Sequence, residues 1–343
     1  MPDVRIVNIE RSIDVTRDQT ILSAALEAGI DYPHGCRSGR CGSCKSRLVE
    51  GEVRLLDHTR FALSEAEREA GLILACRAVP GSDAVVAWLG DEEDRADHPL
   101  RCVEARVSAI EEATHDIRVL RLRPDGPPLA FSAGQYATLT VPGAPPRDYS
   151  MANPPGAAEI ELHVRRVPGG ATSEAIHGRL RPGDRVRLKG PRGAAHLRTG
   201  HTGPILAVAG GSGLAPIRSI VETALALRLR QPIHVYFGAR SERDLYLTDR
   251  FQALADRHAN LRFEAVLSEP TEATGTRAGL VVDAALADLP DLDGWTCYAA
   301  GPPAMVEALA EGAPLNGLRR EDLHADVFFT PEPPLGANER KRA

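Results

Sequence analysis

Short runs in which hydrophobic and polar residues alternate fill the first 90 residues of the chain. A period of two predicts β-strands, and an apolar run that closes at Gly29 predicts a helix over residues 20–28. A second helix is expected to begin at the capping box formed by Ser64 and Glu67. Together these short elements predict one small domain built around a loop rich in glycine and cysteine.

The middle of the chain follows a different pattern. Residues 91–101 are acidic, have almost no apolar side chains and are predicted to form a linker. From residue 102 to residue 200, strands with a period of two are separated by Pro/Gly turns, and only residues 173–180 look helical. This pattern is typical of an antiparallel β-barrel.

Residues 201–330 form the third part, in which short apolar strands alternate with helical stretches. That alternation predicts a parallel sheet covered by helices, so the chain combines α+β and α/β domains. The final residues, 331–343, are rich in proline and then charged, which predicts a loose tail.

Composition narrows the class of protein. Hydrophobic residues make up 43% and charged residues 26%, as in ordinary soluble globular proteins. The net charge of -6 gives no electrostatic reason to bind nucleic acid. There is no apolar run long enough to span a bilayer and no secretory signal pattern. We therefore expect a cytoplasmic protein, and a monomer, that binds neither nucleic acid nor membrane.

Four of the six cysteines lie in the first domain, with the spacing Cys36-x4-Cys41-x2-Cys44 followed by a distant Cys76. This spacing matches the plant-type ferredoxin pattern for a 2Fe-2S cluster. Three glycines in the loop allow it to bend sharply and bring backbone N–H groups to the sulfurs. The four cysteines are the predicted metal ligands, and the remaining two are interpreted as small buried hydrophobes.

Two other metal sites use similar residues. Zinc also binds four cysteines, but structural zinc sites pair two short Cys knuckles, and Cys76 has no near partner. His34 lies close to Cys36, as in a Rieske centre, but such a centre needs a second Cys/His pair, and Arg77 follows Cys76. The spacing favours the 2Fe-2S cluster over both.

Arg147-Asp148-Tyr149-Ser150 is the first candidate flavin site. Arg147 offers a fixed fork of donors to a pyrophosphate, Tyr149 a flat face to an isoalloxazine, and Ser150 a hydroxyl to flavin N5. The segment resembles the Arg-x-Tyr-Ser motif of the ferredoxin–NADP reductase superfamily, where it lies on a barrel strand beside FAD. The alternative is an ordinary polar strand.

A second segment supports the flavin interpretation. Arg165 to Ser173 leads from the end of a predicted strand at Val164 into the helix of this domain. Gly170 allows close backbone approach, while Thr172, Ser173 and the helix N-terminus form an anion site suited to the FAD pyrophosphate. The alternative is a simple helix N-cap at Ser173.

The third domain contains two candidate nicotinamide turns. Gly211, Ser212 and Gly213 connect a strand to a helix, where a dinucleotide phosphate can approach closely. The turn departs from the Rossmann fingerprint, since Pro216 replaces its third glycine, but it resembles the superfamily's Gly-Gly-x-Gly-x-x-Pro form.

The second turn, Gly301-Pro302-Pro303, resembles the superfamily's Cys-Gly-Pro-Pro element, with Ala300 in place of the cysteine. The resemblance also implies a terminal aromatic that covers the flavin until nicotinamide displaces it. Phe328 is our choice, with Phe329 as the alternative, and both could instead close the core. Arg240 would favour an NADPH 2′-phosphate, but nearby acids oppose it, so we expect NADH.

The domain order resembles that of the reductase components of bacterial aromatic-ring-hydroxylating dioxygenases. The likeness covers nearly the whole chain, including residues 114–118, 134–137, 201–204 and 304–309. It implies a β-grasp ferredoxin domain, an FAD barrel and a nicotinamide domain, with Ser150 and Phe328 as catalytic residues.

The same resemblance implies that NAD(P)H reduces FAD by hydride transfer, and that single electrons pass to the 2Fe-2S cluster. From there they would reach a Rieske-type oxygenase or a separate ferredoxin. The alternatives are a reductase for a di-iron monooxygenase or a deoxysugar pathway, and a non-enzymatic iron–sulfur sensor or scaffold.

Basic residues surround the cluster loop, and we hypothesise that they steer an acidic electron acceptor. They are Arg37, Arg40, Lys45 and Arg47. The alternative is that they belong to a solvated loop.

Overall fold

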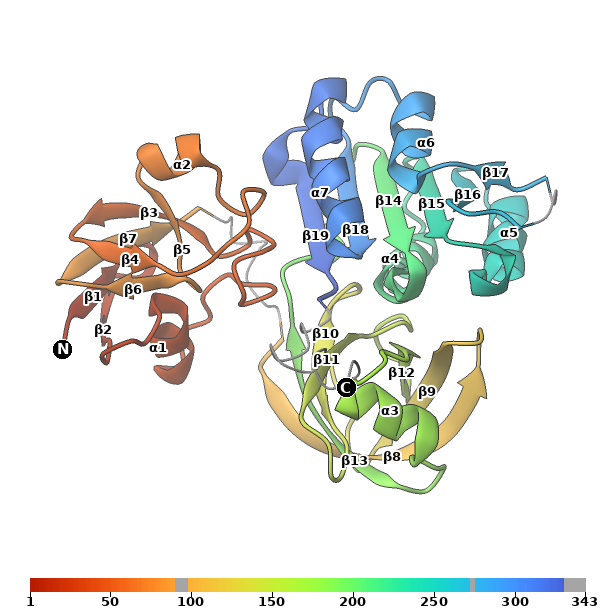
Figure 1. Ribbon diagram of the computed structural model, residues 1–343, viewed down its shortest axis with the longest axis horizontal. Helices are drawn as coiled ribbons and strands as arrows, with labels where there is room; N and C mark the ends of the chain where they lie inside the picture. The colour runs from red at the N-terminus through yellow and green to blue at the C-terminus, as the bar shows by residue number, and fades with distance from the viewer. Residues whose placement is uncertain (90–97, 272–274, 330–343) are drawn as a thin grey trace, which may run out of the picture.

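The computed structural model describes residues 1–89, 98–271 and 275–329, which form three domains (Figure 1). The N-terminal domain lies to one side, and the C-terminal domain lies above the barrel domain. The predicted tail, and most of the predicted linker, fall outside the described residues. None of the described helices is long and apolar enough to cross a membrane.

The N-terminal domain is a mixed five-stranded sheet with two short helices. The strand order is β2 (Arg11–Asp14), β1 (Asp3–Ile6), β7 (Ala84–Trp88), β3 (Lys45–Glu50) and β5 (Leu72–Leu74), and β4 (Val53–Leu55) pairs with β6 (Ala78–Pro80). Helix α1 (Ile21–Glu27) is capped by Thr20, and α2 (Glu65–Glu69) begins at the predicted capping box. The segment between β5 and β6 carries Cys76, and the chain must turn there.

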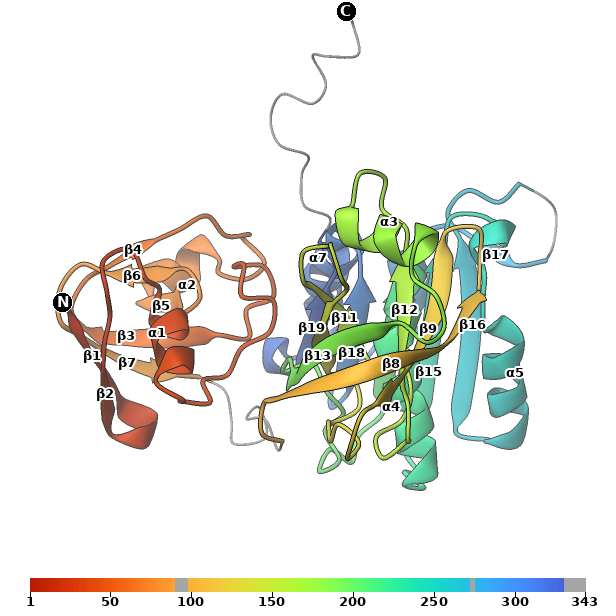
Figure 2. The ribbon, with the colours of Figure 1, turned by 90° about the horizontal axis from the view of Figure 1, so that it is seen from below.

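The second domain confirms the predicted antiparallel barrel. Its sheet has the order β11 (Arg147–Ser150), β10 (Tyr136–Thr140), β13 (Arg185–Arg192), β8 (Arg101–Glu112), β9 (Ile117–Pro124) and β12 (Ile160–Arg165). A bridge between Met151 and Leu162 joins the two edges. Figure 2 shows the long strand β8 curving along the barrel, and helix α3 (Ala171–Gly178) following β12. Alternate residues of β13 fill the core, as the period of two predicts, whereas β12 is buried along nearly its whole length.

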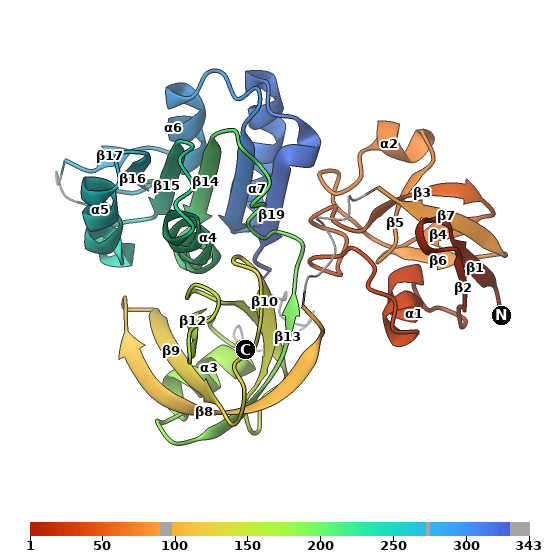
Figure 3. The ribbon, with the colours of Figure 1, turned by 180° about the vertical axis from the view of Figure 1, so that it is seen from behind.

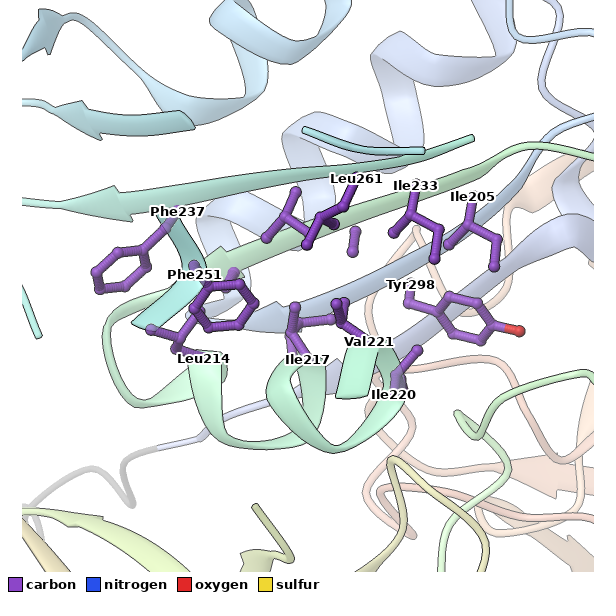
Figure 4. Packing of buried hydrophobic residues seen from close by; sticks show 14 of the residues in the cluster. Ile205, Leu214, Ile217, Ile220, Val221, Ile233, Phe237, Phe251, Leu261 and Tyr298 are labelled. Atoms are coloured by element: carbon purple, nitrogen blue, oxygen red, sulfur yellow. The ribbon is translucent and has the colours of Figure 1, made fainter. Parts of the chain in front are cut away.

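The third domain confirms the predicted parallel sheet. The strand order is β17 (Arg277–Ala278), β16 (Leu261–Leu267), β15 (Ile233–Ala239), β14 (Ile205–Gly210), β18 (Thr296–Gly301) and β19 (Leu323–Val327). The helices are α4 (Leu214–Ala226), α5 (Thr248–Arg257), α6 (Val281–Asp288) and α7 (Pro303–Gly312). In Figure 4, Leu214, Ile217 and Val221 of α4 pack beneath the central strands.

The sequence pattern missed α5, β17 and β19. Helix α5 buries only Phe251, so its apolar stripe is short, and β19 alternates buried and half-buried residues at a sheet edge. Weak patterns of this kind are decided by the packing around them rather than by local sequence.

A buried network of charged groups joins the barrel to the third domain. Glu161 on β12 accepts hydrogen bonds from Arg121 of the barrel and from Arg218 of α4. Burial alone would raise the pKa of Glu161, but His163 and the two arginines lower it to about 2. Burial lowers the pKa of His163, so the ring is neutral, and its partners assign the tautomer: Nε2–H donates to Glu161 and Nδ1 accepts from Tyr246.

Replacing Glu161 by Gln should destabilise the contact between these two domains, because buried Arg218 would keep only one of its two carboxylate partners, Glu222. We expect the free energy of unfolding to fall by about 2 kcal/mol, measured as a lower urea midpoint for flavin release. In the wild type this stabilisation should be lost as the pH falls below 4.5 towards 2, since the pKa is lowered in the folded state. Glu159→Gln, at an exposed pair with Arg123, is the control and should change the midpoint little.

Candidate electron-transfer site

The four predicted ligand cysteines come together in one loop and the segment after β5. Backbone N–H groups point at their sulfurs, as the loop chemistry predicts. The N–H groups of Ser38 and Arg40 lie 3.5 and 3.3 Å from Cys36 Sγ, and the N–H of Cys36 lies 3.3 Å from Cys41 Sγ. Such donors stabilise thiolate ligands, so the donor set fits an iron–sulfur cluster.

The buried half of the loop has the same arrangement. The N–H of Cys76 lies 3.5 Å from Cys44 Sγ, and both side chains are buried in the domain core. Gly39 has a φ of +75°, and a Cβ there would lie 2.7 Å from the side chain of Arg77. Only glycine fits at this turn without displacing the segment that carries the fourth cysteine.

The predicted flavin residues lie on the edge strand β11. Arg147 is exposed, Tyr149 is half-buried against the barrel core, and Ser150 is buried. Ser150 Oγ donates to Asp326 Oδ2 at 2.6 Å, across the boundary between the barrel and β19. Asp326 was not singled out from the sequence as a site residue. The sequence signal that could have identified Asp326 is its position two residues before Phe328, the predicted aromatic of the site.

The loop before α3 is fixed by its own hydroxyl groups. Thr172 Oγ1 donates to the carbonyl of Pro145 at 2.5 Å, and Ser173 Oγ donates to the carbonyl of Gly170 at 3.0 Å. A Cβ at Gly170 would lie 2.8 Å from Ser173 Oγ, so the turn requires glycine. Val164 is fully buried in the barrel core, so only its backbone could face a ligand.

The two glycine turns of the third domain lie against each other. Gly211 has a φ of +55°, and a Cβ at Gly213 would lie 2.0 Å from the carbonyl oxygen of Ala300. Gly301 has a φ of +149°, and a Cβ there would lie 3.0 Å from the N atom of Gly210. The strand ends of β14 and β18 therefore approach more closely than side chains would permit. The N–H of Phe328 donates to the carbonyl of Gly301 at 2.8 Å, which brings the predicted aromatic to this edge.

A cleft of about 440 Å³ opens beside these turns and is lined by Gly211, Pro302 and Arg240 of the third domain. The barrel adds Asp116 and Arg165 to its wall. Sequence reasoning missed Arg165 as a site residue. A Cβ at Gly211 would lie 3.7 Å from its Nη1, and its Nε donates to Asp116 at 2.8 Å. The cleft fits a dinucleotide, because close-packed glycine backbone lies at one end and a guanidinium at its side.

Arg240 has an acidic neighbour, Asp244, at the wall of the cleft. Arg240 Nη2 lies 3.8 Å from Asp244 Oδ1, and Asp244 Oδ2 accepts from Ser241. Ser212 lies within the first glycine turn, in the short helix at residues 211–213.

The cluster loop contacts the barrel and the third domain, as Figures 1 and 3 show from opposite sides. Tyr136 Oη donates to the carbonyl of Gly35 at 2.8 Å. Arg37 pairs with Asp148 at 3.3 Å, and the Arg40 guanidinium lies 4.1 Å from the ring centroid of Phe329.

The basic residues predicted to steer an external acceptor are therefore engaged within the chain. Lys45 pairs with Glu67 at 2.6 Å, and Arg47 donates to the carbonyl of Ala70 at 3.1 Å. In this arrangement Arg37 and Arg40 contact the barrel and the third domain, so the basic docking face for an external protein stays a prediction for the state in which the loop is released.

Comparison with known proteins identifies the family. Models of three known domains match in order: a 2Fe-2S iron–sulfur cluster binding domain at residues 4–81, an oxidoreductase FAD-binding domain at 104–197, and an oxidoreductase NAD-binding domain at 207–311. The chain is 42% identical to the ferredoxin–NAD(P)+ reductase component of the naphthalene 1,2-dioxygenase/salicylate 5-hydroxylase systems of Ralstonia sp., covering 90% of this chain and 93% of the relative. The chain belongs to the ferredoxin–NAD(P)+ reductase components of oxygenase systems.

Other relatives are reductases of other oxygenase systems. The chain is 34% identical to the reductase component of propane 2-monooxygenase from Mycolicibacterium goodii, over 96% of this chain and 99% of the relative. A crystal structure of a cytochrome P450 reductase from Amycolatopsis superposes with a TM-score of 0.77 at 38% identity, covering 96% of this chain and 99% of that one.

These findings confirm the predicted cofactors, which are a 2Fe-2S cluster, FAD and NAD(P)H. They also confirm an oxidoreductase that transfers electrons to an oxygenase, directly or through a ferredoxin. The zinc interpretation of the four cysteines and the non-enzymatic interpretation of the chain are therefore wrong.

Replacing Gly213 by Ala should abolish the close approach of the two glycine turns, because the new Cβ would overlap the carbonyl of Ala300. We expect flavin and cluster to remain bound while the KM for NADH rises at least tenfold, a loss of about 1.4 kcal/mol of binding free energy. Steady-state ferricyanide reduction measures this. Gly178→Ala is the matched control, since a Cβ there meets no atom within 4 Å, and it should leave the KM unchanged.

Proposed function

We propose that this reductase takes hydride from NADH and supplies single electrons to a Rieske-type terminal oxygenase or its separate ferredoxin, as a cytoplasmic monomer. The observation that supports the electron path is that the predicted flavin, nicotinamide and cluster sites lie next to one another. Ser150 bonds Asp326, two residues before Phe328. It is also paired in register with Tyr136, whose hydroxyl binds the carbonyl next to Cys36.

The proposed domains are a ferredoxin domain at 1–90, a linker at 91–101, an FAD domain at 102–200, a nicotinamide domain at 201–330 and a tail at 331–343. All six cysteines are free of disulfides, which is consistent with the reducing cytoplasm.

FAD would lie along β11. In this arrangement Arg147 binds the pyrophosphate, Tyr149 packs on the ring system and Ser150 donates to N5. Because the hydroxyls of Thr172 and Ser173 already bind the loop carbonyls, their backbone N–H groups at the start of α3 are the better pyrophosphate donors. Bound FAD accepts a hydride from nicotinamide and releases the two electrons singly.

NADH would occupy the cleft at the glycine turns. Gly211, Ser212 and Gly213 allow the pyrophosphate to approach, and Arg165 contributes a donor from the barrel side. Gly301 and Pro302 would hold the nicotinamide near Ser150, and the ring of Phe328 would shield the flavin when no nicotinamide is bound.

NADH is favoured over NADPH by the charges at the ribose end of the cleft. The carboxylate of Asp244 lies within 4 Å of Arg240 and offsets the charge that a 2′-phosphate would need. The carboxylate would also repel that phosphate.

An anaerobic titration with NADH tests the electron path. We expect the flavin and cluster absorbance to bleach together, with about three electrons taken up per chain, two by FAD and one by the cluster. A spectrum without flavin, or one that changes with neither NADH nor NADPH, would contradict the proposed function.

The second candidate is a reductase for a di-iron monooxygenase, and the Mycolicibacterium relative, which is the reductase component of propane 2-monooxygenase, motivates it. Reduction assays with purified Rieske ferredoxin and with a di-iron hydroxylase as acceptor distinguish the two. Faster reduction of the hydroxylase would favour the second candidate.

Ser150 and Asp326 form a proton-holding pair beside the proposed flavin N5. Burial raises the pKa of Asp326 to about 6, although the Ser150 hydroxyl donates to it. A protonated Asp326 can donate to Ser150 Oγ, which leaves the serine proton directed at N5. An ionised Asp326 instead accepts that proton in its own hydrogen bond.

We predict that the rate of flavin reduction by NADH falls severalfold as the pH rises through about 6. Asp326→Asn should remove this step, because the neutral amide donates to Ser150 at every pH. Ser150→Ala, the companion variant, should be slow across the whole range. Stopped-flow absorbance between pH 5 and 8 measures all three, and an unchanged step in Asp326→Asn would assign the ionisation to another group.

A further inference from the structure

The cluster loop is attached to the barrel through the strand pair β10 and β11. Tyr136 of β10 is buried, and a Cβ at Gly193 would lie 2.9 Å from its ring, so the ring is closely confined. Its hydroxyl donates to the carbonyl of Gly35, the residue before Cys36. A confined ring with its hydroxyl on the loop backbone determines how far the cluster ligand lies from Ser150, the register partner of Tyr136.

An oriented ion pair provides the second attachment. Asp148 of β11 contacts Arg37 through Oδ2 at 3.3 Å, while its Oδ1 accepts from Thr138 Oγ1 at 2.6 Å. Thr138 and Asp148 are paired across β10 and β11. The hydrogen bond from Thr138 therefore orients the carboxylate of Asp148 without any contribution from the loop. The side chains of Arg37 and Asp148 are 34% and 42% exposed, so solvent and salt weaken this pair.

The third attachment reaches the nicotinamide domain. The guanidinium of Arg40 lies over the ring of Phe329, and Phe329 packs against the core cluster that also contacts Cys41 and Phe61. Cation–π contacts at partly exposed sites are individually weak. Three weak contacts together hold the cluster loop in one position and still allow it to separate from the other domains.

We propose that Tyr136, Asp148 and Phe329 form a docking surface for the chain's own cluster loop, and that they position the cluster for electron transfer from the flavin. This inference rests on the proposed electron path and adds its positioning residues. On the loop, Arg37 contacts Asp148 and Arg40 contacts Phe329. The loop therefore binds the other domains of its own chain first, and the modest strength of each contact allows it to separate after it has received an electron.

Charge reversal and charge exchange test the ion pair. In holoenzyme without any acceptor, Asp148→Arg should slow electron transfer from flavin to cluster about fivefold, because it replaces attraction to Arg37 by repulsion. The double variant Arg37→Asp/Asp148→Arg should restore most of the rate. One-electron photoreduction of the flavin followed by cluster bleaching measures this step directly, so hydride transfer does not limit it.

A matched control and a structural readout accompany the kinetics. Glu104→Arg reverses an exposed acid of the same barrel, paired with Arg187 on the adjacent strand, and should leave the rate unchanged. Small-angle X-ray scattering should show a larger radius of gyration for Asp148→Arg than for the wild type, and a return towards the wild-type value in the double variant.

The outcomes separate the two proposals. An unchanged rate in Asp148→Arg, or a slow rate that the double variant does not restore, would overturn the docking surface. A wild-type flavin that NADH does not bleach would instead overturn the proposed electron path, whatever the docking variants do.

Discussion

The buried carboxylate of Glu161 fixes the barrel and the nicotinamide domain relative to each other. It lies between Arg121 of one domain and Arg218 of the other, and neutral His163 donates a further hydrogen bond to it. A buried charge of this kind tolerates no change of partner, because each group left unpaired would cost several kcal/mol. The relative orientation of β11 and β19, and with it the contact between Ser150 and Asp326, depends on this network.

Close backbone packing provides the second constraint on the site. Gly213 lies against the carbonyl of Ala300, and Gly301 against the N atom of Gly210. The family's cysteine position is occupied by Ala300, which is 2% exposed and packs into the core of the sheet. The fold of this turn therefore depends on the two glycines and on the backbone of residue 300.

The ferredoxin domain is attached more weakly than the other two domains are to each other. Among the described residues, its contacts include the hydrogen bond of Tyr136 to Gly35, the half-exposed ion pair of Arg37 with Asp148 and the cation–π contact of Arg40 with Phe329. Cys41 and Phe61 also pack against the core of the third domain. This difference in strength suits hydride transfer between the two fixed domains and electron delivery by the ferredoxin domain. Hydride transfer requires a fixed geometry, whereas a cluster that must also meet an external acceptor benefits from a contact that can be broken.

The sequence by itself determined the domain classes and the cofactors, and it predicted four cysteines as the cluster ligands. Period-two strands, the alternation of strands and helices, and the Cys36-x4-Cys41-x2-Cys44 spacing are local features, readable because they arise from neighbouring residues. Only the tertiary structure placed Asp326 on Ser150, Arg165 beside Gly211, and Arg37 on Asp148. Each of these pairs joins residues from separate elements, and all three pairs cross a domain boundary. No local pattern records such contacts, since the packing of whole domains decides them.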